Sequence, residues 1–93
     1  MAARAYNQAG TGNLGPIGGR GSGAYLDGIS INTTATSATL KVYDGQDATS
    51  GKLLGTWDCS STPRYIDLDV VCLNGVFAVV AGGAADVTIC VGG

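Results

Sequence analysis

The chain has 93 residues, a formal net charge of −2, three cysteines and no histidine; 45% of its residues are hydrophobic and 13% are charged. This composition is too apolar for a disordered chain, and the dilute charge excludes electrostatic binding of nucleic acid. The cysteines are too widely spaced for a disulfide framework or a zinc motif, and no stretch has the pattern of a signal peptide or a membrane span. We therefore expect one small domain that is made in the cytoplasm and has no nucleic-acid or membrane partner.

The first 23 residues are rich in glycine, and residues 10–15 match the G-x-G-x-x-G spacing of a dinucleotide-binding turn. That turn requires a strand before it and a helix after it. The nine preceding residues contain no β-branched residue, and Pro16 and further glycines follow, which disfavours a helix. We predict instead an extended glycine-rich N-terminal arm, residues 1–23, that reaches neighbouring subunits. Its candidate partner-binding residues are Arg4, Tyr6, Leu14, Ile17 and Arg20.

From Tyr25 onward, apolar residues recur with the period of two that is typical of half-buried strands. Turn-rich connectors separate the alternating segments, and nothing between them has the period of a helix. The pattern predicts an all-β domain over residues 24–93, a small antiparallel β-sandwich or jelly-roll-like barrel of about six strands. The six expected strands are residues 25–32, 38–44, 52–59, 65–72, 75–82 and 86–92.

The alternation also predicts which side chains face the core. In four strands one face is apolar, and these inward residues are Ile29, Ile31, Ala38, Leu40, Val42, Ile66, Leu68, Val70, Val87, Ile89 and Val91. Two strands are apolar on both faces: Phe77 and Val79 lie opposite Val76, Ala78 and Val80, and Leu53 and Trp57 lie opposite Leu54. An outer apolar face is covered either by loops or by neighbouring subunits. We therefore take Trp57, Phe77 and Val79 as a candidate oligomer interface.

Three groups of residues suggest catalysis or metal binding, but each is better explained by a structural role. Asp67 and Asp69 stand two apart on one strand, about 7 Å from each other, which is a separation that glycosidases use; the solvent face of an amphipathic strand has the same pattern. Asp44 and Asp47 lack the spacing and the glutamate of a calcium loop. Cys72 and Cys90 are expected to pack as small apolar groups. We predict no catalytic residue, no metal, no cofactor and no small-molecule substrate: the chain is not an enzyme.

Residues 24–92 also carry a set of turn-and-strand motifs: Tyr43-Asp44-Gly45, Ser50-Gly51, Leu53-Leu54-Gly55-Thr56, Asn74-Gly75, and residues 82–88, Gly-Gly-Ala-Ala-Asp-Val-Thr. In this order they resemble small all-β virion proteins of tailed bacteriophages. Among these, the chain is most similar to capsid decoration, or cement, proteins.

This resemblance implies a non-enzymatic structural protein that docks on the outer capsid surface and stabilises it. The implied partners are the major capsid protein and further copies of the chain itself, in a homotrimer. The implied location is the capsid surface of the virion, after synthesis in the host cytoplasm. The same resemblance permits another virion part, such as a tail, spike or fibre-adaptor subunit. An alternative of a different class is a carbohydrate-binding module that uses exposed aromatic side chains such as Trp57, Tyr43 and Tyr65.

Overall fold

The computed structural model describes residues 4–18 and 24–92. In this part of the chain no helix is long and apolar enough to cross a membrane. The described residues form eight strands joined by turns: β1 (Arg4–Ala9), β2 (Gly12–Ile17), β3 (Ala24–Thr33), β4 (Thr39–Asp44), β5 (Lys52–Asp58), β6 (Arg64–Cys72), β7 (Val76–Ala81) and β8 (Asp86–Gly92).

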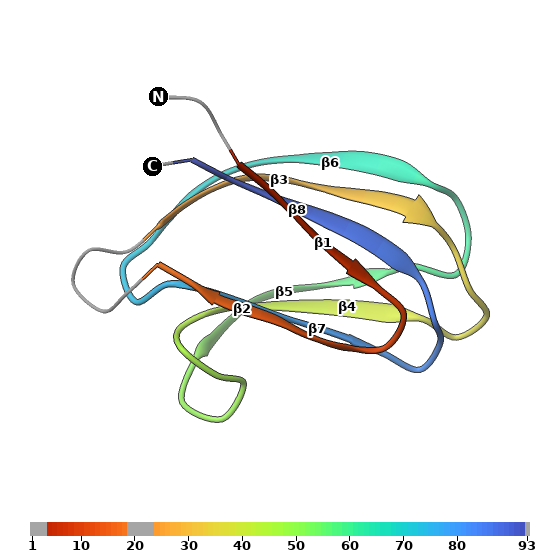
Figure 1. Cartoon of the computed structure of the whole chain (residues 1–93), viewed down its shortest axis with the longest axis horizontal. Helices are drawn as coiled ribbons and strands as arrows, with labels where there is room; N and C mark the ends of the chain where they lie inside the picture. Colours follow the sequence, from red (N-terminus) through yellow and green to blue (C-terminus); the bar gives the residue numbers. More distant parts are fainter. Residues whose placement is uncertain (1–3, 19–23, 93) are drawn as a thin grey trace.

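The strands form two four-stranded antiparallel sheets that lie one above the other as the layers of a sandwich (Figure 1). Sheet A has the order β1-β8-β3-β6, and sheet B has the order β2-β7-β4-β5. The pairing is nested: β1 pairs with β8, β2 with β7, β3 with β6 and β4 with β5. Pairing of β3 with β8 and of β4 with β7 then joins these four strand pairs into the two sheets. The nested pairing brings the two ends of the described chain together in sheet A.

The core lies between the sheets and consists of the inward side chains of both. The six predicted strands are confirmed with bounds within one residue, and in β3, β4, β6 and β8 the alternation also predicted the inward face. Leu26, Ile29, Leu40, Val42 and Ile89 have no exposed surface, and the described residues include no buried polar or charged side chain. Since each buried aliphatic side chain contributes roughly 1.5–3 kcal/mol, this continuous cluster is the main source of stability. It fixes which face of each strand points outward.

The structure corrects the predicted number of strands from about six to eight, because the glycine-rich segment supplies two of them. β1 pairs with β8 over all six of its residues, with Tyr6 opposite Ile89, and β2 pairs with β7, with Leu14 opposite Ala78. Between them the chain crosses from sheet A to sheet B at residues 10–11, where the amide of Gly10 donates to the carbonyl oxygen of Ala85 over 2.9 Å. A separate extended arm is therefore not confirmed: its described part lies in the sandwich.

A bulge in β5 corrects the predicted position of Trp57. The register shifts between Val42, which pairs with Gly55, and Tyr43, which pairs with Leu53, so that Leu54 is the extra residue. Because one inserted residue reverses the alternation, Leu54 and Trp57 both pack against the core and only Leu53 points outward. The indole of Trp57 lies over Gly55, where an added Cβ would stand 2.7 Å from the ring.

Candidate interaction surfaces

A hydrogen-bonded polar cluster covers part of the outer face of sheet A. Its centre is β8, where the Asp86 carboxylate accepts from the amides of Asn7 on β1 (2.7 Å) and Asn32 on β3 (3.0 Å). The hydroxyl oxygen of Thr88 accepts from the same two amides, at 3.2 and 2.8 Å, and Ser30 donates to the Asn32 side chain over 2.7 Å. The two amide donors hold the pKa of Asp86 below its usual value. This cluster therefore ties β1 and β3 to the strand between them.

Two tyrosines lie flat on the same face, each over a glycine of the neighbouring strand. The Tyr65 hydroxyl stands so close to Gly28 that an added Cβ there would overlap it, and an added Cβ at Gly92 would stand 3.2 Å from the Tyr25 ring. Aromatic side chains stabilise sheet glycines in this way. The Tyr65 side chain is nevertheless 53% exposed. Desolvation, and then the charges of Asp27, Cys90 and Asp67, raise the pKa of its hydroxyl.

Asp67 and Asp69 lie on the edge strand β6 and are exposed, as the alternation predicted. Among the described residues no group of three or more histidine, cysteine or acidic side chains is placed to hold a metal ion. Val71, two residues further along, is 63% exposed, and Leu73 in the following turn is 66% exposed. The β6 side of sheet A thus presents acidic and apolar groups together.

The outer face of sheet B is apolar along one row of paired residues. Tyr43 pairs with Phe77 on one side and with Leu53 on the other, and Lys41 pairs with Val79 in the next outward row. Leu53 is 48% exposed, whereas Phe77 is 7% exposed and lies outside the inter-sheet core. Of the candidate interface residues, Val79 is therefore half-exposed on this face, Phe77 is almost covered by its own chain, and Trp57 faces the core.

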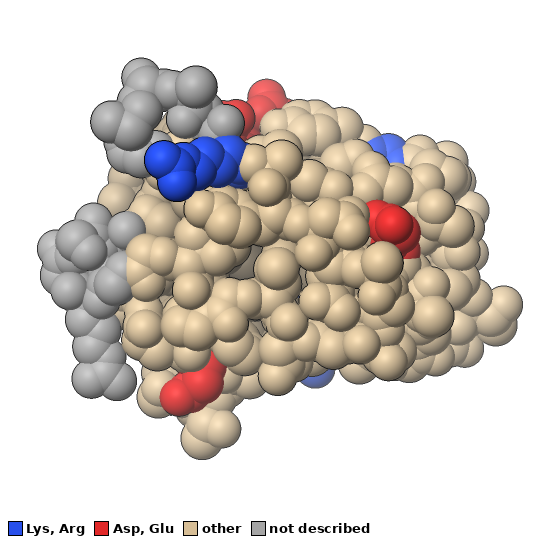
Figure 2. All heavy atoms as spheres, in the orientation of Figure 1, with Lys and Arg blue, Asp and Glu red and all other residues tan. Residues whose placement is uncertain are grey.

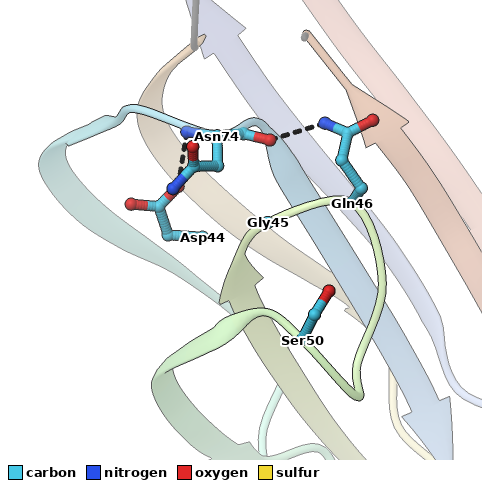
Figure 3. A pocket seen from close by; sticks show the side chains of 5 residues that line it. All are labelled: Asp44, Gly45, Gln46, Ser50 and Asn74. Carbon is cyan, nitrogen blue, oxygen red and sulfur yellow. Dashed lines mark hydrogen bonds between the residues drawn. The ribbon is translucent and has the colours of Figure 1, made fainter. Parts of the chain in front are cut away.

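A hollow of about 320 Å³ opens at the end of the sandwich, between the β4–β5 and β6–β7 connections. Figure 3 shows its lining residues and the hydrogen bonds that join them. Asp44 accepts from the backbone amides of Leu73 (3.3 Å) and Asn74 (2.9 Å), and Gln46 donates to the carbonyl oxygen of Asn74 over 2.5 Å. The polar groups in the hollow thus serve the two turns, and the Asp44 carboxylate binds the backbone amides of the β6–β7 turn.

The candidate arm residues are dispersed by the fold. Tyr6, Leu14 and Ile17 are half-buried and pack against the core, while Arg4 is exposed at the first residue of β1. Arg20 lies outside the described residues. Figure 2 views the side of the molecule that carries β1 and β2, where only a few isolated charged side chains interrupt an uncharged surface.

All three cysteines are free. Cys59 and Cys72 have no exposed surface, and Cys90 is half-buried. Burial raises the pKa of the Cys59 and Cys72 thiols, that of Cys72 to about 11, with a smaller contribution to the latter from the charge of Asp44. Protonated, buried thiols are unreactive, in agreement with the predicted packing role of Cys72.

The sequence did not indicate the polar cluster on sheet A. Asn7 and Asn32 are far apart in the chain, and asparagine is a residue type common in turns. Only the pairing of β8 with both neighbours brings them to one carboxylate. The alternation of β8 was the available signal, since it already placed Asp86 and Thr88 on the outer face.

Comparison of the chain with protein families, with curated proteins and with solved structures finds no match.

Proposed function

We propose that the chain is a non-enzymatic structural component of a virion, a decoration protein that docks on the outer surface of a bacteriophage capsid as an oligomer. The observation that carries this proposal is the nested strand order. The orders β1-β8-β3-β6 and β2-β7-β4-β5 are those of an eight-stranded jelly roll. This architecture recurs in viral capsid and lectin domains. Because a fold hosts many functions, this support is an analogy, and it agrees with the resemblance of residues 24–92.

The distribution of exposed apolar side chains supports a role in assembly. Leu53, Tyr65, Val71 and Leu73 are 48 to 66% exposed. They occur on the outer faces of both sheets and at the turn after β6. Exposed apolar groups on opposite sides suit a small domain that contacts more than one neighbour, as a subunit on a capsid lattice does.

The assembly state is tested by sedimentation of the purified full-length chain. We expect a homotrimer, three chains of 9.2 kDa each. Measurement from about 1 to 100 μM separates a stable trimer from a weak one, since a trimer that dissociates loses mass on dilution. A 9.2 kDa species across the whole range contradicts the oligomeric part of the proposal.

Capsid attachment is tested by adding the chain to phage capsids that lack a decoration protein. We expect saturable co-sedimentation and a higher temperature of genome release, because a protein that binds only the assembled shell stabilises it by mass action. A variant with Leu26→Asp, which buries a charge in the core, is the unfolded control. Absence of saturable binding by the folded chain argues against a decoration role.

A second candidate function, binding of carbohydrate, is favoured by one specific observation. Tyr65 presents a flat, half-exposed ring next to the polar cluster of Asn7, Asn32, Asp86 and Thr88. An aromatic face beside amide and carboxylate groups matches the alternating apolar and hydroxyl surfaces of a sugar ring. Screening the wild-type chain and Tyr65→Ala against a glycan panel tests it: glycan binding that Tyr65→Ala abolishes supports this function, and no binding removes it.

A further inference from the structure

We propose that copies of the chain associate edge to edge, the edge strand β6 of one copy pairing with the edge strand β1 of the next, so that sheet A continues from copy to copy. This inference rests on the proposed self-association and specifies its interface. It commits to a second copy of the chain as the partner of each edge.

The first observation is the direction of the two edge strands of sheet A. The sheet has four strands in the order β1-β8-β3-β6, and each strand is antiparallel to its neighbours. The edge strands β1 and β6 therefore run in opposite directions. When two copies stand side by side in the same orientation, β6 of one meets β1 of the other antiparallel, which is the more stable form of pairing. Among the described residues each of these edges has a partner strand on one side only, so its outer backbone groups are available for a further strand.

The second observation is that the edges of sheet A are regular, whereas those of sheet B are interrupted. β1 pairs with β8 over six residues without a register shift, and exposure alternates along all nine residues of β6. The register shift between β3 and β6 lies beside Asp27 of β3 and leaves this alternation unbroken. In sheet B, β5 is bulged at Leu54, and β2 contains Pro16 and a register shift. Bulges and proline hinder the addition of a strand, so sheet A provides the edges that pair.

The third observation is that the inward side chains of the two edge strands are only half-buried. On β6 these are Ile66, Leu68 and Val70, and on β1 the large apolar one is Tyr6. All four pack against the core. The inward residues of β8, which has a strand on both sides, are at most 5% exposed. Pairing of β6 with β1 of the next copy gives the edge side chains a second neighbour and extends the core across the contact.

Charge decides between like and unlike edges. Asp67 and Asp69 are exposed at the two central outward positions of β6, so antiparallel pairing of two β6 strands would place carboxylates opposite carboxylates, which is destabilising. β1 has no acidic residue, and its outward positions hold Ala5, Asn7 and Ala9. The side of the molecule that carries β1 is also largely uncharged (Figure 2). Pairing of β6 with β1 therefore avoids the repulsion that two β6 edges would meet.

A contact between two unlike edges is heterologous, so it either closes into a ring or continues as a filament. Closure leaves no free edge in sheet A, and free edges are the sites at which uncontrolled strand addition occurs. A closed ring of three copies is the form that agrees with the proposed trimer.

Cross-linking of introduced cysteines tests the interface. Ala5→Cys places a thiol on β1, and Asp67→Cys or Asp69→Cys places one on β6; all three positions are exposed. Two β6 positions are used because alternation allows more than one register that keeps the outward rows together. Every variant also carries Cys90→Ala, because Cys90 stands opposite Ala5 within the chain. The other two cysteines have no exposed surface and are kept.

Mild oxidation of mixed variants gives the measurement. Two thiols cross-link only when their Cβ atoms come within about 4 Å, and in a heterologous contact one edge never meets its own kind, so we expect Ala5→Cys mixed with one of the β6 variants to give at least tenfold more covalent dimer than any variant alone. Ala5→Cys mixed with Thr56→Cys, an exposed outward position on β5, is the matched control and stays at background. Circular dichroism verifies that all variants are folded.

The outcomes separate this inference from the proposed function. If the wild type associates but neither mixture exceeds the Thr56→Cys control, the edge contact is wrong while self-association stands. If a β6 variant cross-links with itself as strongly as with Ala5→Cys, like edges meet and the inference is refuted. If the wild type is a monomer throughout the sedimentation range, the inference is refuted as well, and capsid co-sedimentation alone then decides the proposed function.

Discussion

Strands β1 and β8 are neighbours in sheet A, yet their sequences differ in every feature that predicts a strand. β8 alternates strictly, and its inward residues Val87, Ile89 and Val91 are at most 5% exposed. β1 reads RAYNQA, contains no β-branched residue, and its one large apolar side chain, Tyr6, is half-buried. β8 is thus specified by its own pattern, whereas β1 is specified by the ladder on which it docks. The comparison teaches that a strand at the edge of a sheet needs little intrinsic propensity when its partner is already in place.

β2 repeats this relation in sheet B. It reads GNLGPI and pairs with β7, whose residues Val76, Ala78 and Val80 are at most 2% exposed. Both N-terminal strands lie at sheet edges, where glycine and proline are tolerated. Deletion and substitution therefore measure how much stability these weak strands add.

Deletion of residues 1–21 is expected to unfold the domain. It removes β1 and β2, which leaves the backbone hydrogen-bonding groups at the edges of β8 and β7 without partners. It also removes the side chains of Tyr6, Leu14 and Ile17, which pack against the core. Circular dichroism and thermal melting of the truncated chain measure the effect. If the truncated chain melts cooperatively at the wild-type temperature, the two strands are accessory, as the sequence alone suggested.

The paired residues Ile89 and Tyr6 compare the two kinds of strand directly, because they face each other in the ladder. Ile89→Ala removes a side chain with no exposed surface and is expected to cost about 2–5 kcal/mol. Tyr6→Ala removes a half-buried side chain and is expected to cost about 1–3 kcal/mol. Denaturant unfolding gives both values. Equal losses contradict the subordinate role of β1.

Gly15→Ala tests the close contact of β2 with β7. Gly15 has a φ of 110°, and an added Cβ would stand 2.6 Å from the carbonyl oxygen of Val76. The expected cost is about 1–3 kcal/mol. Gly10→Ala is the matched control, since its φ is 88° and an added Cβ meets nothing within 4 Å; about 1 kcal/mol is expected there. A Gly15 variant no less stable than the Gly10 variant removes the close-contact explanation.

Asp86 links β1 to the sheet in a pH-dependent way. Its pKa in the folded chain lies below the ordinary value of 3.8 because Asn32 and Asn7 donate to the carboxylate. Its contribution to stability is therefore present above pH 3.8 and is lost as the pH falls through the lower, folded-state pKa. Asp86→Asn is expected to reduce the loss of stability on acidification, measured by unfolding at a series of pH values from about 5 to 2. An unchanged acid profile would show that the carboxylate does not titrate with folding.

The sequence alone predicted the part of the fold in which local pattern and burial agree. In β3, β4, β6 and β8, residues at alternate positions are apolar because one face of each strand enters the core, so the strands and their inward faces were predictable. β7 is apolar at every position, so the strand was predictable but alternation did not distinguish its two faces. Within β5 the same reasoning failed for Trp57, because the bulge at Leu54 changes which face the later residues occupy. The sequence pattern of β5 does not reveal this bulge.

The candidate surfaces were predictable only in part. Val79 and the exposed carboxylates of Asp67 and Asp69 follow from alternation within single strands. The polar cluster around Asp86 depends on which strands are neighbours. Strand order arises from contacts between residues distant in sequence, and a period of two carries no information about it.

What the sequence by itself determined is an all-β domain with six strands, four of them with a defined inward face, because a half-buried strand must alternate. What only the tertiary structure decided is that residues 4–9 and 12–17 complete the two sheets. These segments have too few apolar residues to bury a face alone, and they become strands because the nested pairing leaves β8 and β7 with open edges beside them. The backbone amides and carbonyls of those edges need partners, and the N-terminal segment supplies them.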